Sequence, residues 1–352
     1  MDWLRSKSDM ALNSKKRLST NYKSQSAMEY LMTYGWAILV IAIILAALYT
    51  LGIFNPLTFE PRLQPGGCYV ERPYGPGQAS GLSLVGECGY LLPKFVGGFN
   101  GKDSNVSASL TTLEYLNTGK FSVSAWIYVN GPTSMGEQMP ISIGDDVCSS
   151  TYGPEDNGTI LLAAPAYPAS INLFYSPSTG TPVVFDSGNP DYFKAAACVY
   201  NKTYGGAQWA YTNYPFGHYK AWYFVAETYN GTYLDLYING RLVNKTYAPG
   251  YTNLPTNYIS LGNMDSPLMS GRFWFNGSIS NVQIYNASLG SAVISDMYDE
   301  NIAGAPVDLI NLVSWIPLNG NENDYSGNTA GGKFYSGNFN GGWVDNYNYF
   351  DR

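Results

Sequence analysis

The chain has 352 residues, of which 45% are hydrophobic and 13% are charged, so it can bury a core and is too apolar to be disordered. Its net charge of −7 argues against a nucleic-acid partner, because phosphate binding needs a basic surface. The charge is uneven: residues 1–24 hold six basic and two acidic residues, for +4, and the rest hold 13 basic and 24 acidic residues, for −11.

An apolar run without charged residues follows the basic head and extends from Leu31 to Phe54. At about 1.5 Å per residue it spans roughly 36 Å, which is enough to cross a bilayer as a helix. Asn55-Pro56 is expected to end that helix. Basic residues before a span favour the cytoplasmic side, so the acidic bulk of the chain is predicted to lie outside the cell.

The residues before the apolar run, KSQSAMEYL at 23–31, resemble the class III signal peptide of archaeal type IV pilins and archaellins. In that family a prepilin peptidase cuts after a basic-small pair and before a Gln, here between Ser24 and Gln25. The resemblance implies that residues 1–24 are removed and that residues 25–55 form a pilin-like hydrophobic helix. Copies of the chain would then assemble on a membrane platform into a helical filament. Ala27 stands where the family usually has Ser.

Glu29 falls at the fifth mature position if Gln25 is the first. A carboxylate at the membrane end of an apolar helix is costly unless it is paired, and the resemblance implies pairing with the new amino terminus of a neighbouring subunit. The alternative is a signal-anchor helix in which Glu29 reaches the interface.

The four cysteines, Cys68, Cys88, Cys148 and Cys198, all follow the apolar run. An even number on the exported side without a CxxC spacing favours two disulfides over a metal site. Of the three pairings we favour Cys68–Cys88 with Cys148–Cys198, because each closes a loop of moderate length. Buried free thiols remain the alternative. Residues 56–94 are interpreted as a disulfide-bearing linker.

Strand patterns dominate the rest of the chain. Residues 121–129 alternate with period two. Residues 222–246 contain three short strands joined by Asn230-Gly231 and Asn239-Gly240, and Asn-Gly is typical of type I′ turns because both central residues need positive φ. We therefore predict a three-stranded antiparallel meander in which Leu234, Leu236 and Ile238 share one face.

The last elements follow in quick succession. Residues 275–286 are predicted to form a strand, and Ser288 is expected to cap a short helix from Gly290 to about Asn301. A final strand is predicted at residues 312–318.

Four segments, FSVSAWIYV, TYNGTYLDLYINGRLV, FNGSISNVQIYNASL and LVSWIPLNGNENDYSGN, resemble pieces of the laminin-G-like, concanavalin A-like jelly roll. The resemblance implies a mainly β protein, an antiparallel β-sandwich at residues 95–352, carried on the long N-terminal helix. The last segment normally opens such a domain, so the resemblance implies circular permutation or a truncated second copy. Residues 144–220 match poorly and are interpreted as an insertion.

Enzymatic chemistry is not expected. No predicted strand carries the closely spaced carboxylates of a retaining glycosidase, and His218 is the only histidine, which excludes a multi-histidine metal site and leaves no nucleophile with a base. No cofactor is required by the sequence. Calcium is a candidate at Asp324 and Asn328, because relatives of this fold bind it with such oxygens; Asx turns explain the same residues.

Binding is the expected function. Trp209, Tyr211 and Tyr214 are candidate platforms for a sugar, although aromatic segments also pack on themselves or on subunits. N-linked glycans are expected on some of the exported Asn-x-Ser/Thr sequons. These begin at Asn105, Asn157, Asn201, Asn230, Asn244, Asn276 and Asn286.

Together these features predict a membrane precursor that becomes a filament subunit on the cell surface, adhesive through its jelly roll and partnered by its own copies and by glycans or other cell surfaces. A monomeric membrane-anchored lectin-like adhesin and an archaellin are the alternatives, and an exoenzyme on a membrane stalk is the least favoured. The mature N-terminus separates the first two.

Overall fold

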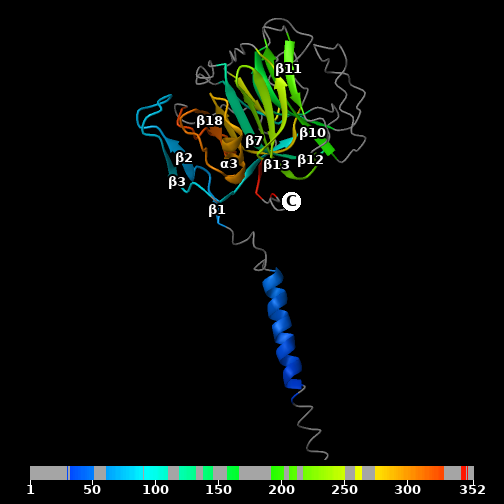
Figure 1. Cartoon of the computed structure of the whole chain (residues 1–352). Coiled ribbons are helices and arrows are strands. Elements are labelled where there is room, and N and C mark those ends of the chain that lie inside the picture. The colour runs from blue at the N-terminus through cyan, green and yellow to red at the C-terminus, as the bar shows by residue number, and fades with distance from the viewer. Residues whose placement is uncertain are drawn as a thin grey trace, which may run out of the picture. The chain divides into compact units, whose positions relative to one another are not determined.

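The computed structural model forms two compact units, Met1–Pro61 and Arg62–Arg352 (Figure 1). The residues that it describes are 30, 32–50, 61–89, 91–109, 119–131, 138–145, 157–165, 192–201, 206–211, 217–249, 258–263, 274–328, 342–345 and 347. In the first unit, Met32–Thr50 is a helix with a mean hydropathy of 2.1 and no buried residue, long and apolar enough to cross a membrane. Ser24, Gln25, Glu29 and Asn55-Pro56 lie outside the described residues.

The second unit is a sandwich of two antiparallel sheets. One sheet has eight strands in the order β15-β14-β13-β7-β17-β5-β19, with β18 paired to β17, and the other has seven in the order β11-β10-β9-β8-β16-β6, with β12 paired to β10. The first sheet comprises β5 (Val96–Asn100), β7 (Phe121–Val129), β13 (Trp222–Tyr229), β14 (Tyr233–Ile238), β15 (Arg241–Tyr247), β17 (Asn276–Tyr285), β18 (Leu312–Ile316) and β19 (Trp343–Val344). The second comprises β6 (Val106–Ser109), β8 (Gln138–Asp145), β9 (Asn157–Pro165), β10 (Tyr192–Asn201), β11 (Gly206–Tyr211), β12 (Gly217–His218) and β16 (Tyr258–Leu261).

The main hydrophobic core lies between the two sheets. Alternate residues of β7 enter it, among them Val123, Ala125 and Ile127, while Trp126 joins a second cluster on the other face of the sheet. The predicted meander is confirmed as β13, β14 and β15. Its predicted face is confirmed as well, because Leu234, Leu236 and Ile238 are all buried in this core.

The two Asn-Gly turns of the meander differ. Asn239 and Gly240 both have positive φ, 48° and 74°, which fits the predicted type I′ turn. The same prediction is wrong for the first turn, since β14 begins only at Tyr233 and Asn230 is not among the positive-φ residues of the described chain. Instead, Oδ1 of Asn230 accepts hydrogen bonds from the backbone N–H groups of Thr232 and Tyr233, at 2.9 and 2.8 Å.

The outer face of the eight-stranded sheet is covered by the second hydrophobic cluster, to which residues before β5 contribute Leu63, Cys68, Val70 and Leu92. These residues come from β1 (Arg62–Leu63), β2 (Cys68–Glu71) and β4 (Leu92–Pro93), with β3 (Ser83–Gly86) paired to β2. Residues 62–94 are therefore part of the folded body and not the predicted linker. Alternate residues of β2 hold this segment against the body, because Cys68 and Val70 are buried whereas Tyr69 and Glu71 are exposed.

The disulfide expected between Cys68 and Cys88 is present, with Cα atoms 5.1 Å apart. Cys148 and the side chain of Cys198 lie outside the described residues, so that pairing stays a prediction. The short helix is α3 (Ser291–Asp299). Its N-cap is Gly290, which makes no side-chain cap, so the predicted capping by Ser288 is wrong: Ser288 stands two residues before the N-cap.

Two further sequence interpretations bear on the sandwich. The segment interpreted as an insertion at 144–220 supplies β9, β10, β11 and β12 to the seven-stranded sheet, so its described part is integral to the fold. The late strand β18 pairs with the second half of β17, whose first half pairs with β5. A late and an early strand thus share one edge of β17, which is the arrangement that the predicted permutation requires.

Candidate functional site

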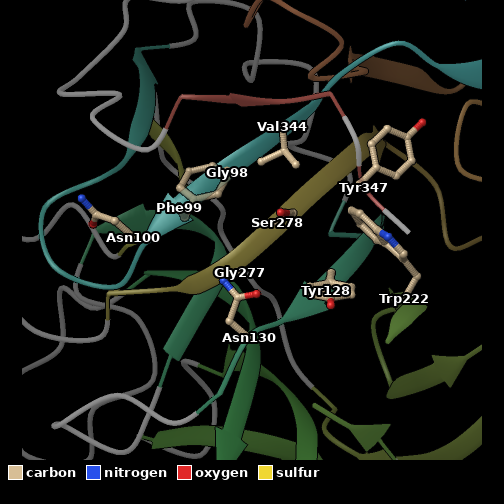
Figure 2. Close-up of a pocket in the computed structure, with 10 residues that line it drawn as sticks. All are labelled: Gly98, Phe99, Asn100, Tyr128, Asn130, Trp222, Gly277, Ser278, Val344 and Tyr347. Atoms are coloured by element: carbon tan, nitrogen blue, oxygen red, sulfur yellow. The ribbon is translucent and has the colours of Figure 1, made fainter. Parts of the chain in front are cut away.

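A pocket of about 360 Å³ lies on the outer face of the eight-stranded sheet, where β5, β17, β7 and β13 meet the segment after β19 (Figure 2). Its described lining residues are glycines, aromatic and amide residues, one serine and one valine. They are Gly98, Phe99, Asn100, Tyr128, Asn130, Trp222, Gly277, Ser278, Val344 and Tyr347.

The floor of the pocket is one row of residues placed by strand register. Ser278 of β17 is opposite Gly98 on one side and Tyr128 on the other, and Tyr128 is opposite Trp222. The row therefore runs from two small residues to two large aromatic ones, whose ring centroids are 5.6 Å apart. Small residues leave room above the sheet, and the rings form the other end of the hollow.

Gly277 is part of the lining for a steric reason. A Cβ at this position would lie 2.0 Å from the backbone oxygen of Tyr128. Only glycine allows β17 to approach β7 so closely, and this contact sets the floor that Ser278 and Tyr128 share.

A row of asparagines lies next to the floor. Asn276 is opposite Asn100, and its Oδ1 accepts a hydrogen bond from Nδ2 of Asn130 at 3.3 Å. Oδ1 of Asn100 accepts the backbone N–H groups of Lys102 and Asp103 at 2.9 and 3.1 Å, and that of Ser104 at 3.3 Å. Asn100 and Asn130 are both exposed, so two amide groups stand at the rim of the pocket.

The remaining wall comes from the C-terminal segment. β19 pairs with β5 over two residues, and the carbonyl of Gly342 accepts the N–H of Gly98 at 3.0 Å. The hydroxyl of Tyr347 donates to the carbonyl of Pro93, and its ring lies edge-on to Trp222 with centroids 6.0 Å apart. The guanidinium of Arg62 lies 5.2 Å from the centroid of the Tyr347 ring. Residues far apart in the sequence therefore fix this wall.

The aromatic residues chosen from the sequence belong elsewhere. Trp209 and Tyr211 lie on β11, at the edge of the seven-stranded sheet; their side chains and all of Tyr214 lie outside the described residues. Sequence reasoning missed Tyr128 and Trp222 as site residues. The available signal was their place on two correctly predicted strands, at positions that face away from the core between the sheets.

Both calcium candidates, Asp324 and Asn328, make hydrogen bonds that hold the C-terminal loop in place. Oδ1 of Asp324 accepts the N–H groups of Trp315 and Ser326 at 3.0 and 2.8 Å. Nδ2 of Asn328 donates to the carbonyls of Leu312 and Val313 at 2.8 and 2.9 Å, and its Oδ1 accepts the N–H of Gly77. Both side chains are buried, and a structural role accounts for them. Calcium binding there stays a prediction.

Arg72 completes that loop. Its guanidinium donates to the carbonyls of Ser326 (2.8 Å), Gln78 (2.7 Å), Leu309 (3.2 Å) and Leu312 (3.1 Å). Burial lowers the pKa of Arg72 from its usual value, and the negative charge of Asp324 opposes that effect. The early hairpin β2–β3 and the late strand β18 are thus joined by one side chain.

The sequons differ in exposure. Asn230 is exposed, whereas Asn105, Asn244, Asn276 and Asn286 are half-buried. The side chains of Asn157 and Asn201 lie outside the described residues.

A sandwich of two antiparallel sheets with an aromatic and amide-lined pocket on one outer face is a lectin-like jelly roll. Residues 100–295, more than half of the chain, match the family model of the concanavalin A-like lectin/glucanases superfamily, and the chain belongs to that family.

Solved structures of the same kind are only distantly similar. A native heptameric SAP-like pentraxin from Limulus polyphemus is 12% identical, with a TM-score of 0.42 over 71% of this chain and 92% of that chain. The CBM40 of the Ruminococcus gnavus IT-sialidase, bound to alpha2,3 sialyllactose, is 12% identical, with a TM-score of 0.37 over 55% of this chain and 94% of that chain. No curated protein matches the sequence. Similarity this distant does not indicate function.

Proposed function

We propose that the chain is a surface-displayed glycan-binding protein whose jelly roll holds a sugar in the pocket of Tyr128 and Trp222. The observation that carries the proposal is the floor row, which sets two aromatic rings beside a serine and a glycine. Family membership supports it, because the family comprises lectins as well as glucanases.

The chemistry of the lining suits a sugar ring. A pyranose has an apolar face of C–H groups, which packs on an aromatic ring, and hydroxyls around its edge, which need donors and acceptors together. Asn130 offers both in one side chain, Asn100 keeps one amide N–H besides the one that it donates to Asp103, and Ser278 adds a hydroxyl. The described lining residues hold no carboxylate and no histidine, so we expect binding without hydrolysis of the glycan.

A glycan array tests this proposal. The full chain in detergent, clustered on a multivalent support, is expected to bind a subset of glycans, because repeated weak contacts add up when they are displayed together. Tyr128→Ala is expected to abolish the signal. An array that stays blank with correctly folded protein would refute glycan binding.

The mode of display is a second part of the proposal. The helix Met32–Thr50 is apolar and unburied, so it needs lipid or other helices around it. The signal-like residues that precede it favour a filament subunit over a monomeric anchored adhesin; the leading form is a type IV pilin-like subunit, and an archaellin is the alternative. Cleavage between Ser24 and Gln25, followed by pairing of Glu29 with a neighbouring amino terminus, is the step that would commit the chain to a filament.

The N-terminus of the mature protein distinguishes the filament subunit from the monomeric anchor. We expect mass spectrometry to find Gln25 at the N-terminus, and Glu29→Ala to prevent filament formation while the processed chain stays folded in the membrane. Normal filaments from correctly processed Glu29→Ala protein would remove Glu29 from assembly, and an uncut N-terminus would favour the monomeric anchor.

A further inference from the structure

We infer that the pocket of Tyr128 and Trp222 takes a neutral pyranose unit and rejects sugars that carry a carboxylate. This inference rests on the proposed function and narrows its ligand class. Its starting point is that none of the described lining residues is charged. Polar recognition there depends on amides, hydroxyls and backbone groups.

Two charged groups beside the lining, Arg62 and Asp103, are already engaged. The guanidinium of Arg62 lies on the ring of Tyr347 and donates to the carbonyl of Pro93 at 3.3 Å. Oδ1 of Asp103 accepts Nδ2 of Asn100 at 2.6 Å. The guanidinium of Arg62 is thus held by Tyr347 and Pro93, and the carboxylate of Asp103 is hydrogen-bonded to the rim residue Asn100.

A sialic or uronic acid finds no cation among the described lining residues, so in the pocket its carboxylate would lose hydration without gaining a counter-charge there. Burying part of a charge without a counter-ion is unfavourable. The chain after residue 24 also carries a net charge of −11, so the long-range field repels an anionic glycan as it approaches. Neither effect acts on a neutral hexose.

The size and shape of the pocket favour a short unit. A volume of about 360 Å³ is at the low end of the roughly 300–1,000 Å³ typical of ligand pockets. The floor has its rings at one end, at Tyr128 and Trp222, and its amides at the rim, at Asn100 and Asn130 (Figure 2). One sugar ring that packs on Tyr128 and directs its hydroxyls toward the asparagines would contact both the rings and the amides.

The test compares neutral sugars with sugars that carry a carboxylate. Lactose and α2,3-sialyllactose are coupled at equal density to one polymer, with maltose, cellobiose and mannobiose as further neutral probes and digalacturonic acid as a second acidic one. Binding to the full chain in detergent is measured for each polymer. At least one neutral polymer is expected to bind, and the acidic polymers to bind at least tenfold more weakly than the best neutral one.

Variants locate the selectivity in the pocket. Asn130 is exposed, so Asn130→Arg places a cation at the rim without disturbing the core, and it is expected to narrow the neutral-to-acidic ratio about tenfold. Tyr128→Ala is expected to lower neutral binding at least tenfold. Asn130→Ala is expected to lower it by a smaller factor, and since Asn130 is exposed, this loss would not arise from repacking of the core. The matched control is Tyr247→Ala on β15, at the far edge of the same sheet and 58% exposed, which is expected to change nothing.

The outcomes are distinguishable. Equal or tighter binding of the acidic polymers by the unmodified chain would overturn the neutral class and leave glycan binding intact. Binding that survives both Tyr128→Ala and Asn130→Ala would overturn this pocket as the site. If no polymer binds, the proposed function itself fails, and the inference fails with it.

Discussion

Arg72→Met removes the side chain that joins the β2–β3 hairpin to the C-terminal loop, and the structure gives the size of the effect. Four carbonyl oxygens lose a charged donor, and the bonds to Ser326, Leu309 and Leu312 are part-buried, whereas the bond to Gln78 is exposed. A buried group left unpaired costs about 1–3 kcal/mol. Because the carbonyl of Leu312 keeps its hydrogen bond from Asn328, the apolar stem is kept and some carbonyls regain water, we expect the free energy of unfolding to fall by about 2–4 kcal/mol.

Urea unfolding of the detergent-solubilised full chain, followed by tryptophan fluorescence, measures this loss. Arg72→Lys keeps the charge and fewer of the bonds, so about half of the loss is expected. Arg241→Met is the control, since Arg241 is exposed on β15 and an exposed substitution changes stability by about 0.5 kcal/mol or less. If Arg72→Met falls within that range as well, the carbonyls do not depend on Arg72 and the reasoning is refuted.

Two further predictions concern pH and the disulfide. Burial raises the pKa of Tyr229 to about 12, and its hydroxyl donates to the carbonyl of Ala248 at 2.7 Å. Because this pKa exceeds the unfolded value of 10.0, the protonated hydroxyl stabilises the fold fully below pH 10. This stabilisation is lost as the pH rises toward 12. The unfolding free energy, measured against Tyr229→Phe, should therefore drop by about 2–3 kcal/mol over that interval, and a constant difference would contradict the shift. Replacing Cys68 and Cys88 by Ala opens a loop of sequence separation 20 and should cost about 3 kcal/mol in the same urea assay, whereas an unchanged midpoint would show that the bridge does not stabilise the fold.

Local signals in the sequence were sufficient for several strands of the eight-stranded sheet, and insufficient for the seven-stranded sheet and for the segment that covers the outer face. β7 and the meander β13–β15 follow from period-two alternation and Asn-Gly turns, because a strand places every second side chain on the same face of the sheet. The covering segment at 62–94 has short strands whose partners are far away in the chain, such as Leu63 on Lys94 and Asn319. No local pattern encodes such contacts, so the segment resembled a linker.

The candidate site was predictable only in kind. Aromatic residues were expected to form it, but Trp209, Tyr211 and Tyr214 were chosen because they cluster in the sequence. Tyr128 and Trp222 are 94 positions apart and become neighbours through the register of β7 and β13. Tyr347 joins them through a hydrogen bond to Pro93. Strand register and contacts between distant segments depend on the whole fold, so local patterns in a single sequence do not predict them.

The place where the tether enters the folded body has a mechanical consequence. Arg62 is the first residue of the larger unit; it belongs to β1, which pairs with β4 over only two residues, and its guanidinium rests on Tyr347. If the chain is displayed as proposed and is pulled away from a bound partner, tension along the backbone reaches this short pairing before any strand of the sandwich. The load would then enter the folded unit next to Tyr347, which also lines the pocket.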